Sequence, residues 1–188
     1  MISTRRAPSG SSHSIQKRAY GAADLRLSDT TALLGALYLS WGKFNAAEAQ
    51  IKEAIHIAKA AGGANNTNLA NSTILLGDLY VETSRFTDAE AAYREALQAM
   101  ESDSTQKPFD LAIVLDRVGM ALDLQQRAAD ALPYLERALA IMDSENQNAG
   151  LYRVNVLENL AAVYRELDRE ADAEVIDERL RMLQSTSR

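Results

Sequence analysis

The sequence predicts an all-α fold made of four successive helical hairpins. Three observations indicate it: landmark residues recur every 42 residues, apolar residues within each unit are spaced three and four apart, and polar segments separate the units. Glycine stands at Gly35, Gly77 and Gly119, and one further step reaches Ala161. Spacings of three and four place side chains on one face of a helix, whereas the alternation typical of a half-buried strand is absent.

The first unit, residues 29–67, contains two helical segments. We expect a first helix over residues 31–41, a break at Gly42 and Lys43, and a second helix over residues 44–60. One face of the second helix holds Ala47, Ile51, Ala54, Ile55 and Ala58. A stripe of this kind is what a helix on the surface of a globular protein buries against its neighbour.

The next three units, residues 68–109, 110–151 and 152–184, repeat this organisation, and residues 185–188 are left as a short C-terminal tail. The stripes of the second and third units consist of Ala89, Tyr93, Ala96, Leu97 and Met100, and of Ala131, Leu135, Ala138, Leu139 and Met142. The connectors near residues 62–67, 102–107 and 143–150 are polar. Their Gly and Asn residues tolerate the backbone that ends a helix, and Asn or Thr can cap the next one.

The recurring small residues predict a close helix crossing within each hairpin. We expect the glycines and Ala161 to face Ala47, Ala89, Ala131 and Ala173 of the second helices. Glycine inside a helix costs about 0.5–1 kcal/mol relative to alanine, so a close approach must offset it. The aromatic residues Tyr38, Tyr80 and Tyr164, with Phe44 and Phe86, should fill the space around the crossing, and Trp41 should pack against the neighbouring hairpin.

The order of these landmarks resembles the tetratricopeptide repeat, whose pattern has Leu-Gly-x2-Tyr in the first helix and two alanines in the second. The matches are Leu34-Gly35 with Tyr38, Leu76-Gly77 with Tyr80, and Val118-Gly119 with Leu122. The fourth unit departs from the pattern, because Asp177 stands where a large apolar residue is expected and Leu180 where a small one is. The 42-residue stride is similar to the repeats of kinesin light chain, and the resemblance implies an α-solenoid that forms a right-handed superhelical arc.

The resemblance also implies a concave face lined by the first helices. Carrying that geometry over gives the candidate partner-binding residues Asn71, Asp78, Glu82, Asp116, Arg117, Asp123, Asn155, Glu158, Asn159, Arg165 and Glu166. This face is net acidic and more apolar in the first repeat, so it would suit a peptide with an apolar end and a basic stretch. The alternative interpretation, that each charge belongs to a solvated face, stays open.

The resemblance favours a non-catalytic scaffold or adaptor that binds a protein or peptide through the concave face. The alternative is a structural or assembly subunit of a larger complex, docked by its ends or its convex face, and the N-terminal end looks the less finished. A receptor for chaperone tails is disfavoured, since Ala32 and Ala36 stand where its clamp needs polar residues. We expect no enzyme activity, cofactor or metal, because the chain has no cysteine and its histidines, His13 and His56, have no partner at ligand spacing.

Charge is divided unevenly along the chain. Residues 1–23 hold four basic residues and no acidic one, so with a total of −6 the remaining 165 residues carry −10. An acidic body argues against nucleic acid as a partner, and no apolar run is long enough to span a membrane, so we expect a soluble protein. Residues 1–28 form a basic, Ser-rich tail that is either an organellar transit peptide or an ordinary tail, which leaves a cytoplasmic and a mitochondrial location open.

Overall fold

The computed structural model describes residues 25–61, 66–102, 107–144 and 150–186. Within these ranges the chain forms eight α-helices and no strand, so the predicted all-α fold is confirmed. In chain order the helices are α2 (Leu25–Ser40), α3 (Phe44–Ala60), α4 (Asn66–Glu82), α5 (Phe86–Glu101), α6 (Pro108–Asp123), α7 (Ala128–Ser144), α8 (Gly150–Glu166) and α9 (Glu170–Thr186). Residues 1–24 of the predicted N-terminal tail, which raised the question of a transit peptide, lie outside the described residues.

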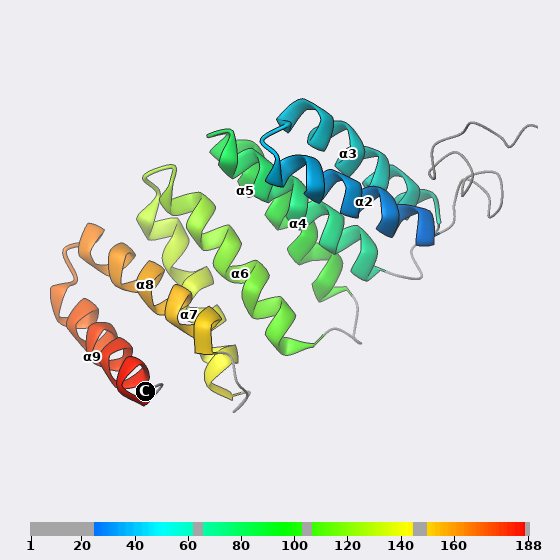
Figure 1. Ribbon diagram of the computed structural model, residues 1–188. Coiled ribbons are helices and arrows are strands. Elements are labelled where there is room, and N and C mark those ends of the chain that lie inside the picture. The colour runs from blue at the N-terminus through cyan, green and yellow to red at the C-terminus, as the bar shows by residue number, and fades with distance from the viewer. Residues whose placement is uncertain (1–24, 62–65, 103–106, 145–149, 187–188) are drawn as a thin grey trace, which may run out of the picture.

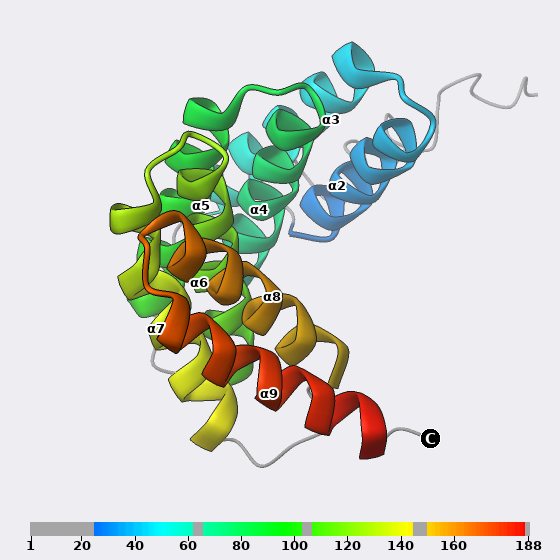
Figure 2. The ribbon, with the colours of Figure 1, turned by 90° about the vertical axis from the view of Figure 1, so that its left-hand side faces the viewer.

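The helices pair in chain order into four hairpins, α2 with α3, α4 with α5, α6 with α7 and α8 with α9. Each hairpin packs against the next, and Figure 1 shows the four of them side by side along one direction. Figure 2 shows the array bending into an arc, with α2 and α4 nearer its inner side than α3 and α5. None of the described helices is long and apolar enough to cross a bilayer.

The helix bounds agree with the sequence in the second helix of the first hairpin and differ at both ends of the array. Helix α3 spans the predicted residues 44–60. Helix α2, however, begins at Leu25, and α9 continues to Thr186, so both take in residues that we assigned to tails. The early start of α2 has a physical reason: Leu27 and Ser28 are buried, and the Ser28 hydroxyl donates a 2.9 Å hydrogen bond to the carbonyl oxygen of Ala54.

The turn inside each hairpin has one backbone geometry, repeated four times. The residues with positive φ are Gly42 (68°), Ser84 (57°), Gln126 (60°) and Asp168 (56°). The N–H of the following residue donates to the carbonyl five positions back, as from Lys43 to Tyr38 at 2.9 Å. This is the Schellman ending of a helix, in which glycine is the favoured residue. The sequence marked only Gly42, because the other three positions hold residues with a side chain.

The helix crossing also repeats, but the partner of the small residue differs from our expectation. A Cβ added to each glycine would lie 2.6 Å from Ile51 for Gly35, 2.4 Å from the Tyr93 ring for Gly77 and 2.6 Å from Leu135 for Gly119. The expected alanines contribute only their backbone, since the carbonyl oxygens of Ala47 and Ala131 are 3.5 Å from these positions. Each glycine is therefore covered by the large side chain that follows the alanine by four residues.

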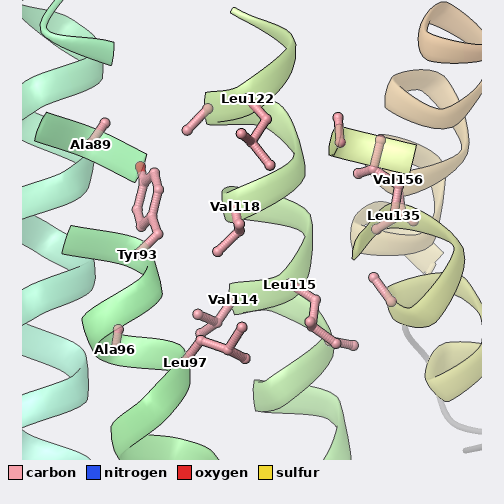
Figure 3. Close-up of a cluster of buried hydrophobic side chains, with 14 of the residues drawn as sticks. Ala89, Tyr93, Ala96, Leu97, Val114, Leu115, Val118, Leu122, Leu135 and Val156 are labelled. Carbon is pink, nitrogen blue, oxygen red and sulfur yellow. The ribbon is translucent and has the colours of Figure 1, made fainter. Parts of the chain in front are cut away.

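The core runs through the middle of the array. Figure 3 shows Tyr93 and Leu97 of α5 with Val114 of α6, Leu135 of α7 and Val156 of α8, all of them buried. Continuous packing of neighbouring hairpins is the source of stability in repeat proteins, where a single unit cannot bury its apolar face.

Two aromatic residues of the first hairpin lie outside this core. The Trp41 side chain is 58% exposed, so our expectation that it packs against the neighbouring hairpin is wrong. Its ring meets Tyr38 edge-on at 6.2 Å between centroids and has the Lys43 ammonium 5.1 Å away, both within its own hairpin. Phe44 is 37% exposed and fills the crossing only in part, whereas Tyr80 and Tyr164 are buried as expected.

Candidate functional site

A hollow of about 650 Å³ opens on the side of the first helices. It lies where α4 and α6 approach each other less closely than α2 approaches α4 or α6 approaches α8. We call it the larger hollow; its lining residues are Leu39, Ser40, Asp78, Val81, Glu82, Tyr93, Arg117 and Met120. Three first helices and one second helix thus build it together.

A smaller hollow of about 180 Å³ lies between α6 and α8. Its lining residues are Ile113, Asp116, Arg117, Met120, Tyr152, Asn155, Glu158 and Asn159. Because Arg117 and Met120 line both hollows, the two adjoin along α6. We call the pair of hollows the groove.

The floor of the larger hollow is fixed by a chain of polar contacts. The Tyr93 hydroxyl donates a 2.7 Å hydrogen bond to Oδ1 of Asp78, and Nη1 of Arg117 lies 3.5 Å from the same oxygen. Burial, and then the negative charge of Asp78, raise the pKa of Tyr93 well above its usual value. The phenol therefore stays protonated and holds the Asp78 carboxylate in one orientation.

The smaller hollow has a second fixed carboxylate. Asn159 of α8 donates from Nδ2 to Oδ1 of Asp116 on α6, at 2.8 Å. Burial raises the pKa of Asp116, while the Asn159 hydrogen bond and the Arg117 charge act in the opposite direction. This contact ties α6 to α8 across the groove.

Two further carboxylates of the groove are exposed and have no partner. Within the described residues, neither Glu82 nor Glu158 forms a hydrogen bond or an ion pair. On the side of the second helices, by contrast, ion pairs join one hairpin to the next: Lys59–Glu95 at 2.7 Å, Arg127–Glu90 at 2.7 Å, Arg137–Glu101 at 2.6 Å and Arg179–Asp143 at 2.8 Å, with Arg127 in the turn just before α7. The carboxylates of Glu82 and Glu158 are thus available to pair with a ligand.

The structure brings together seven of the eleven candidate residues. Those that line the groove are Asp78, Glu82, Asp116, Arg117, Asn155, Glu158 and Asn159.

The other four candidates, Asn71, Asp123, Arg165 and Glu166, line neither hollow. Arg165 forms an ion pair with Asp177 of its own hairpin instead. Asp123 has a buried Oδ1 without a hydrogen-bond partner, and burial, then the charge of Glu166, raise the pKa of its carboxyl group.

Sequence reasoning missed two aromatic residues of the groove. Tyr93 belongs to the buried stripe of α5, but its hydroxyl reaches the groove across Gly77. The signal was a tyrosine at the position that holds Ile51 in the first hairpin and Leu135 in the third. Tyr152 lies on the first helix of the fourth hairpin, is 46% exposed and meets the Phe109 ring edge-on at 5.6 Å. Nothing in its spacing set it apart from the surface.

No three His, Cys, Asp or Glu side chains in the described part of the chain converge in a way that could hold a metal ion. The groove can offer a ligand carboxylates, amides, hydroxyl groups, one guanidinium and apolar side chains.

Residues 47–102 match the sequence model of a tetratricopeptide repeat family. No curated protein matches the chain. Among solved structures, BtubC (BKLC) from P. vanneervenii is 25% identical with a TM-score of 0.79, and the match covers 87% of this chain and 66% of BtubC. This chain thus spans slightly less than two thirds of that protein.

Two further structures share the fold. A kinesin light chain protein of Podosopora anserina with nearly identical TPR-like repeats is 16% identical, with a TM-score of 0.74 over 94% of this chain and 83% of that one. YrrB, described as a TPR protein with an unusual peptide-binding site, is 15% identical, with a TM-score of 0.52 over 93% of both chains. The resemblance seen in the sequence is confirmed: residues 47–102 match a tetratricopeptide repeat model, and the described chain has the fold of kinesin-light-chain-like repeat proteins.

Proposed function

We propose that the chain is a non-catalytic interaction module that holds a peptide segment of a protein partner in the groove. The observation that carries this proposal is the pair of unpartnered carboxylates, Glu82 and Glu158, beside the apolar side chains of Leu39, Val81 and Met120. The binding of a peptide by YrrB, a structure of the same fold, supports the proposal as an analogy.

The charges of the groove define the ligand. It contains four carboxylates, those of Asp78, Glu82, Asp116 and Glu158, against the single guanidinium of Arg117. Since Arg117 already lies beside Asp78, a ligand meets a negative surface with an apolar centre. A segment with Lys or Arg residues next to one or two apolar residues is complementary to it.

A second candidate function is a structural or assembly subunit that docks by one end of the array. One observation favours it: Leu33 and Leu37 of α2, and Trp41 directly after it, are exposed at the N-terminal end. An end surface and the groove lie on different parts of the first helices, so the two functions are compatible.

The experiment is selection from a phage-displayed pool of random 12-residue peptides, followed by fluorescence polarisation with the enriched sequences. We expect enrichment of peptides that combine Lys or Arg with an apolar residue. Substituting Glu82→Lys or Glu158→Lys should weaken their binding by about 3- to 10-fold each, and the wild-type affinity should fall with rising salt. Neither substitution removes a contact of the fold.

Glu174→Lys is the matched control, because Glu174 is exposed on α9 outside the groove and the substitution changes the charge by the same amount. It should leave the affinity within about twofold of the wild type, as expected for a charge remote from the ligand. Enriched peptides that bind the wild type and the Glu82→Lys and Glu158→Lys variants equally well would refute the groove as the binding site.

A further inference from the structure

The outer face of α2 carries three large apolar side chains in contact with solvent. Leu33 is 71% exposed, Leu37 43% and Trp41, which immediately follows the helix in the turn, 58%. Spaced four apart, they form one stripe along the helix, which we call the α2 stripe. No charged residue occurs between Asp29 and Lys43, so the stripe lies in an uncharged stretch.

The α2 stripe lies on the face of α2 that points away from its own hairpin. Successive helical residues are about 100° apart, so Leu37, two positions after Gly35, lies about 200° round the helix from it. Gly35 faces α3, and the stripe therefore points away from the first hairpin. The residues one, two and three repeats further on, Leu79, Ala121 and Val163, are all at most 1% exposed.

Those three residues lie in α4, α6 and α8, each of which packs against the second helix of the preceding hairpin. Among the described residues, no hairpin precedes α2. The α2 stripe thus occupies the face with which the other first helices contact a preceding hairpin, and in α2 this face has no such packing partner among the described residues. Exposed contiguous apolar surface of this kind marks an interaction site.

The exposed face of α9, at the opposite end of the array, is a poor packing partner for the α2 stripe of a second copy. Leu97 and Leu139, which are 7% and 6% exposed, correspond to Arg181 in α9. The Arg181 side chain is 66% exposed and pairs with Glu178. Stacking the α9 end of one copy on the α2 end of another would bury this ion pair, which is costly without new partners. A head-to-tail filament is therefore disfavoured.

The α2 stripe is instead complementary to itself. Leu33 and Trp41 are equidistant from Leu37 along the sequence, so two antiparallel copies of α2 would place Leu37 against Leu37 of the second copy, and Leu33 against Trp41 of the second copy. A two-fold interface needs this reciprocity. The absence of charges between Asp29 and Lys43 lets the two helices approach without desolvating an ion.

We propose that two copies of this chain form an antiparallel, two-fold dimer through the α2 stripe. The 16 residues of α2 are about 24 Å long, and one helix face of that length buries less than about 1,200 Å², the range of weak and transient complexes. The dimer is accordingly concentration-dependent, with a dissociation constant in the micromolar range. The groove is not part of this surface, since no residue of the stripe lines it.

The test is sedimentation velocity of the full chain between about 1 and 200 μM, together with acrylamide quenching of Trp41, the only tryptophan. We expect the 20.6 kDa monomer to shift to a dimer as concentration rises, with the quenching constant falling at least about twofold as Trp41 is covered. Leu37→Glu should remain monomeric and be readily quenched throughout. Val175→Glu is the control, because Val175 is 61% exposed on α9, and this variant should dimerise like the wild type.

Three results would overturn the proposal. A wild-type monomer with freely quenched Trp41 at every concentration would show that the stripe stays uncovered. A monomer in which Trp41 is shielded at every concentration, and becomes quenched when residues 1–24 are deleted, would show that the chain's own N-terminal segment covers it. A dimer that persists in Leu37→Glu would place the interface elsewhere, and circular dichroism of this variant checks that it is folded.

Discussion

The second and fourth hairpins build the same helix crossing from different residues. In the second, Gly77 lies beneath the buried Tyr93 ring, and a Cβ at Gly77 would come within 2.4 Å of it. In the fourth, the positions related by the repeat hold Ala161, which is 2% exposed, and the partly buried Asp177. A large side chain on the second helix requires glycine on the first, whereas a smaller one accepts alanine.

The two solutions also lead to different chemistry. In the second hairpin the large side chain ends in a hydroxyl, which crosses Gly77 and holds Asp78 in the groove. In the fourth, Asp177 pairs with Arg165, which lies outside the groove. The middle of the array thus uses the crossing to shape the candidate binding site, and the C-terminal end uses it to place an ion pair near the surface.

The largest effects should come from changes at the helix crossing of the second hairpin, of which the first is Gly77→Ala. The added methyl meets the side of a buried ring that cannot withdraw without breaking its bond to Asp78. Overpacking of this kind costs typically 1–3 kcal/mol, and the better helix propensity of alanine returns less than about 1 kcal/mol. We therefore expect the free energy of unfolding, measured by urea denaturation, to fall by about 2 kcal/mol.

A double-mutant cycle sharpens this prediction. Tyr93→Ala alone should cost about 3–5 kcal/mol, because it empties the space over Gly77. In that background Gly77→Ala should stabilise the fold by about 0.5–1 kcal/mol, since only the helix propensity remains. If Gly77→Ala destabilised the chain equally in both backgrounds, the ring would not be the reason for the glycine.

The fold could be predicted from the sequence further than the site could. The 42-residue stride and the apolar stripes depend on local spacing, so they located the helices; the second helix of the first hairpin was predicted to the residue. The start of α2 was missed, because Ser28 is buried by a bond to Ala54, 26 residues away. A contact between distant residues leaves no local signal.

Contacts between distant residues limited the prediction of the groove even more than that of the fold. The resemblance to tetratricopeptide repeats placed Asp78, Asp116 and Glu158 on the inner face of the first helices, and these residues do line the groove. Spacing gave no means of knowing that α4 and α6 separate or that the Tyr93 hydroxyl reaches between them. Both depend on how whole helices pack, and the side chains that decide it come from different repeats.

Alkaline pH should distinguish the two hairpins through their tyrosines. Burial and the charge of Asp78 raise the pKa of Tyr93 well above its usual value, and burial and Glu136 raise the pKa of Tyr164 to about 12. An acid with a raised pKa in the folded state contributes stability that is complete below its unfolded value, near 10, and is lost as pH rises above it. Each tyrosine should thus lower the free energy of unfolding by about 1.4 kcal/mol per pH unit above 10.

Unfolding by urea between pH 9 and 11.5 measures this slope. Tyr93→Phe should remove one such contribution, because phenylalanine cannot titrate, and Tyr164→Phe should remove another. Effects of Lys52, whose pKa is also raised, cancel in the comparison with the wild type. A slope unaltered in Tyr93→Phe would mean that the phenol is as free to ionise in the folded chain as in the unfolded one.

At neutral pH the same substitution tests the hydrogen bond itself. Tyr93→Phe keeps the ring over Gly77 but removes the donor to Asp78, which should cost about 1 kcal/mol. Tyr164→Phe removes a 2.9 Å bond to Glu136 of α7, an exposed residue that water can solvate, so its cost should be smaller. Equal losses in the two variants would show that the Tyr93–Asp78 bond in the groove stabilises the fold no more than the Tyr164–Glu136 bond does.

The smallest effect should come from the turns, where the two hairpins agree. Ser84 and Asp168 both take positive φ in a Schellman ending, a backbone that costs a residue with a side chain about 1 kcal/mol. Ser84→Gly and Asp168→Gly should each raise the free energy of unfolding by a few tenths to about 1 kcal/mol, with the smaller gain at Asp168 because aspartate tolerates this region better. Gly42→Ala, at the same position of the first hairpin, should have the opposite sign. If both glycine variants are more stable than the wild type, the second and fourth hairpins differ in their helix crossings and not in their turns. A loss of stability in either variant would reveal a side-chain contact that outweighs the backbone strain.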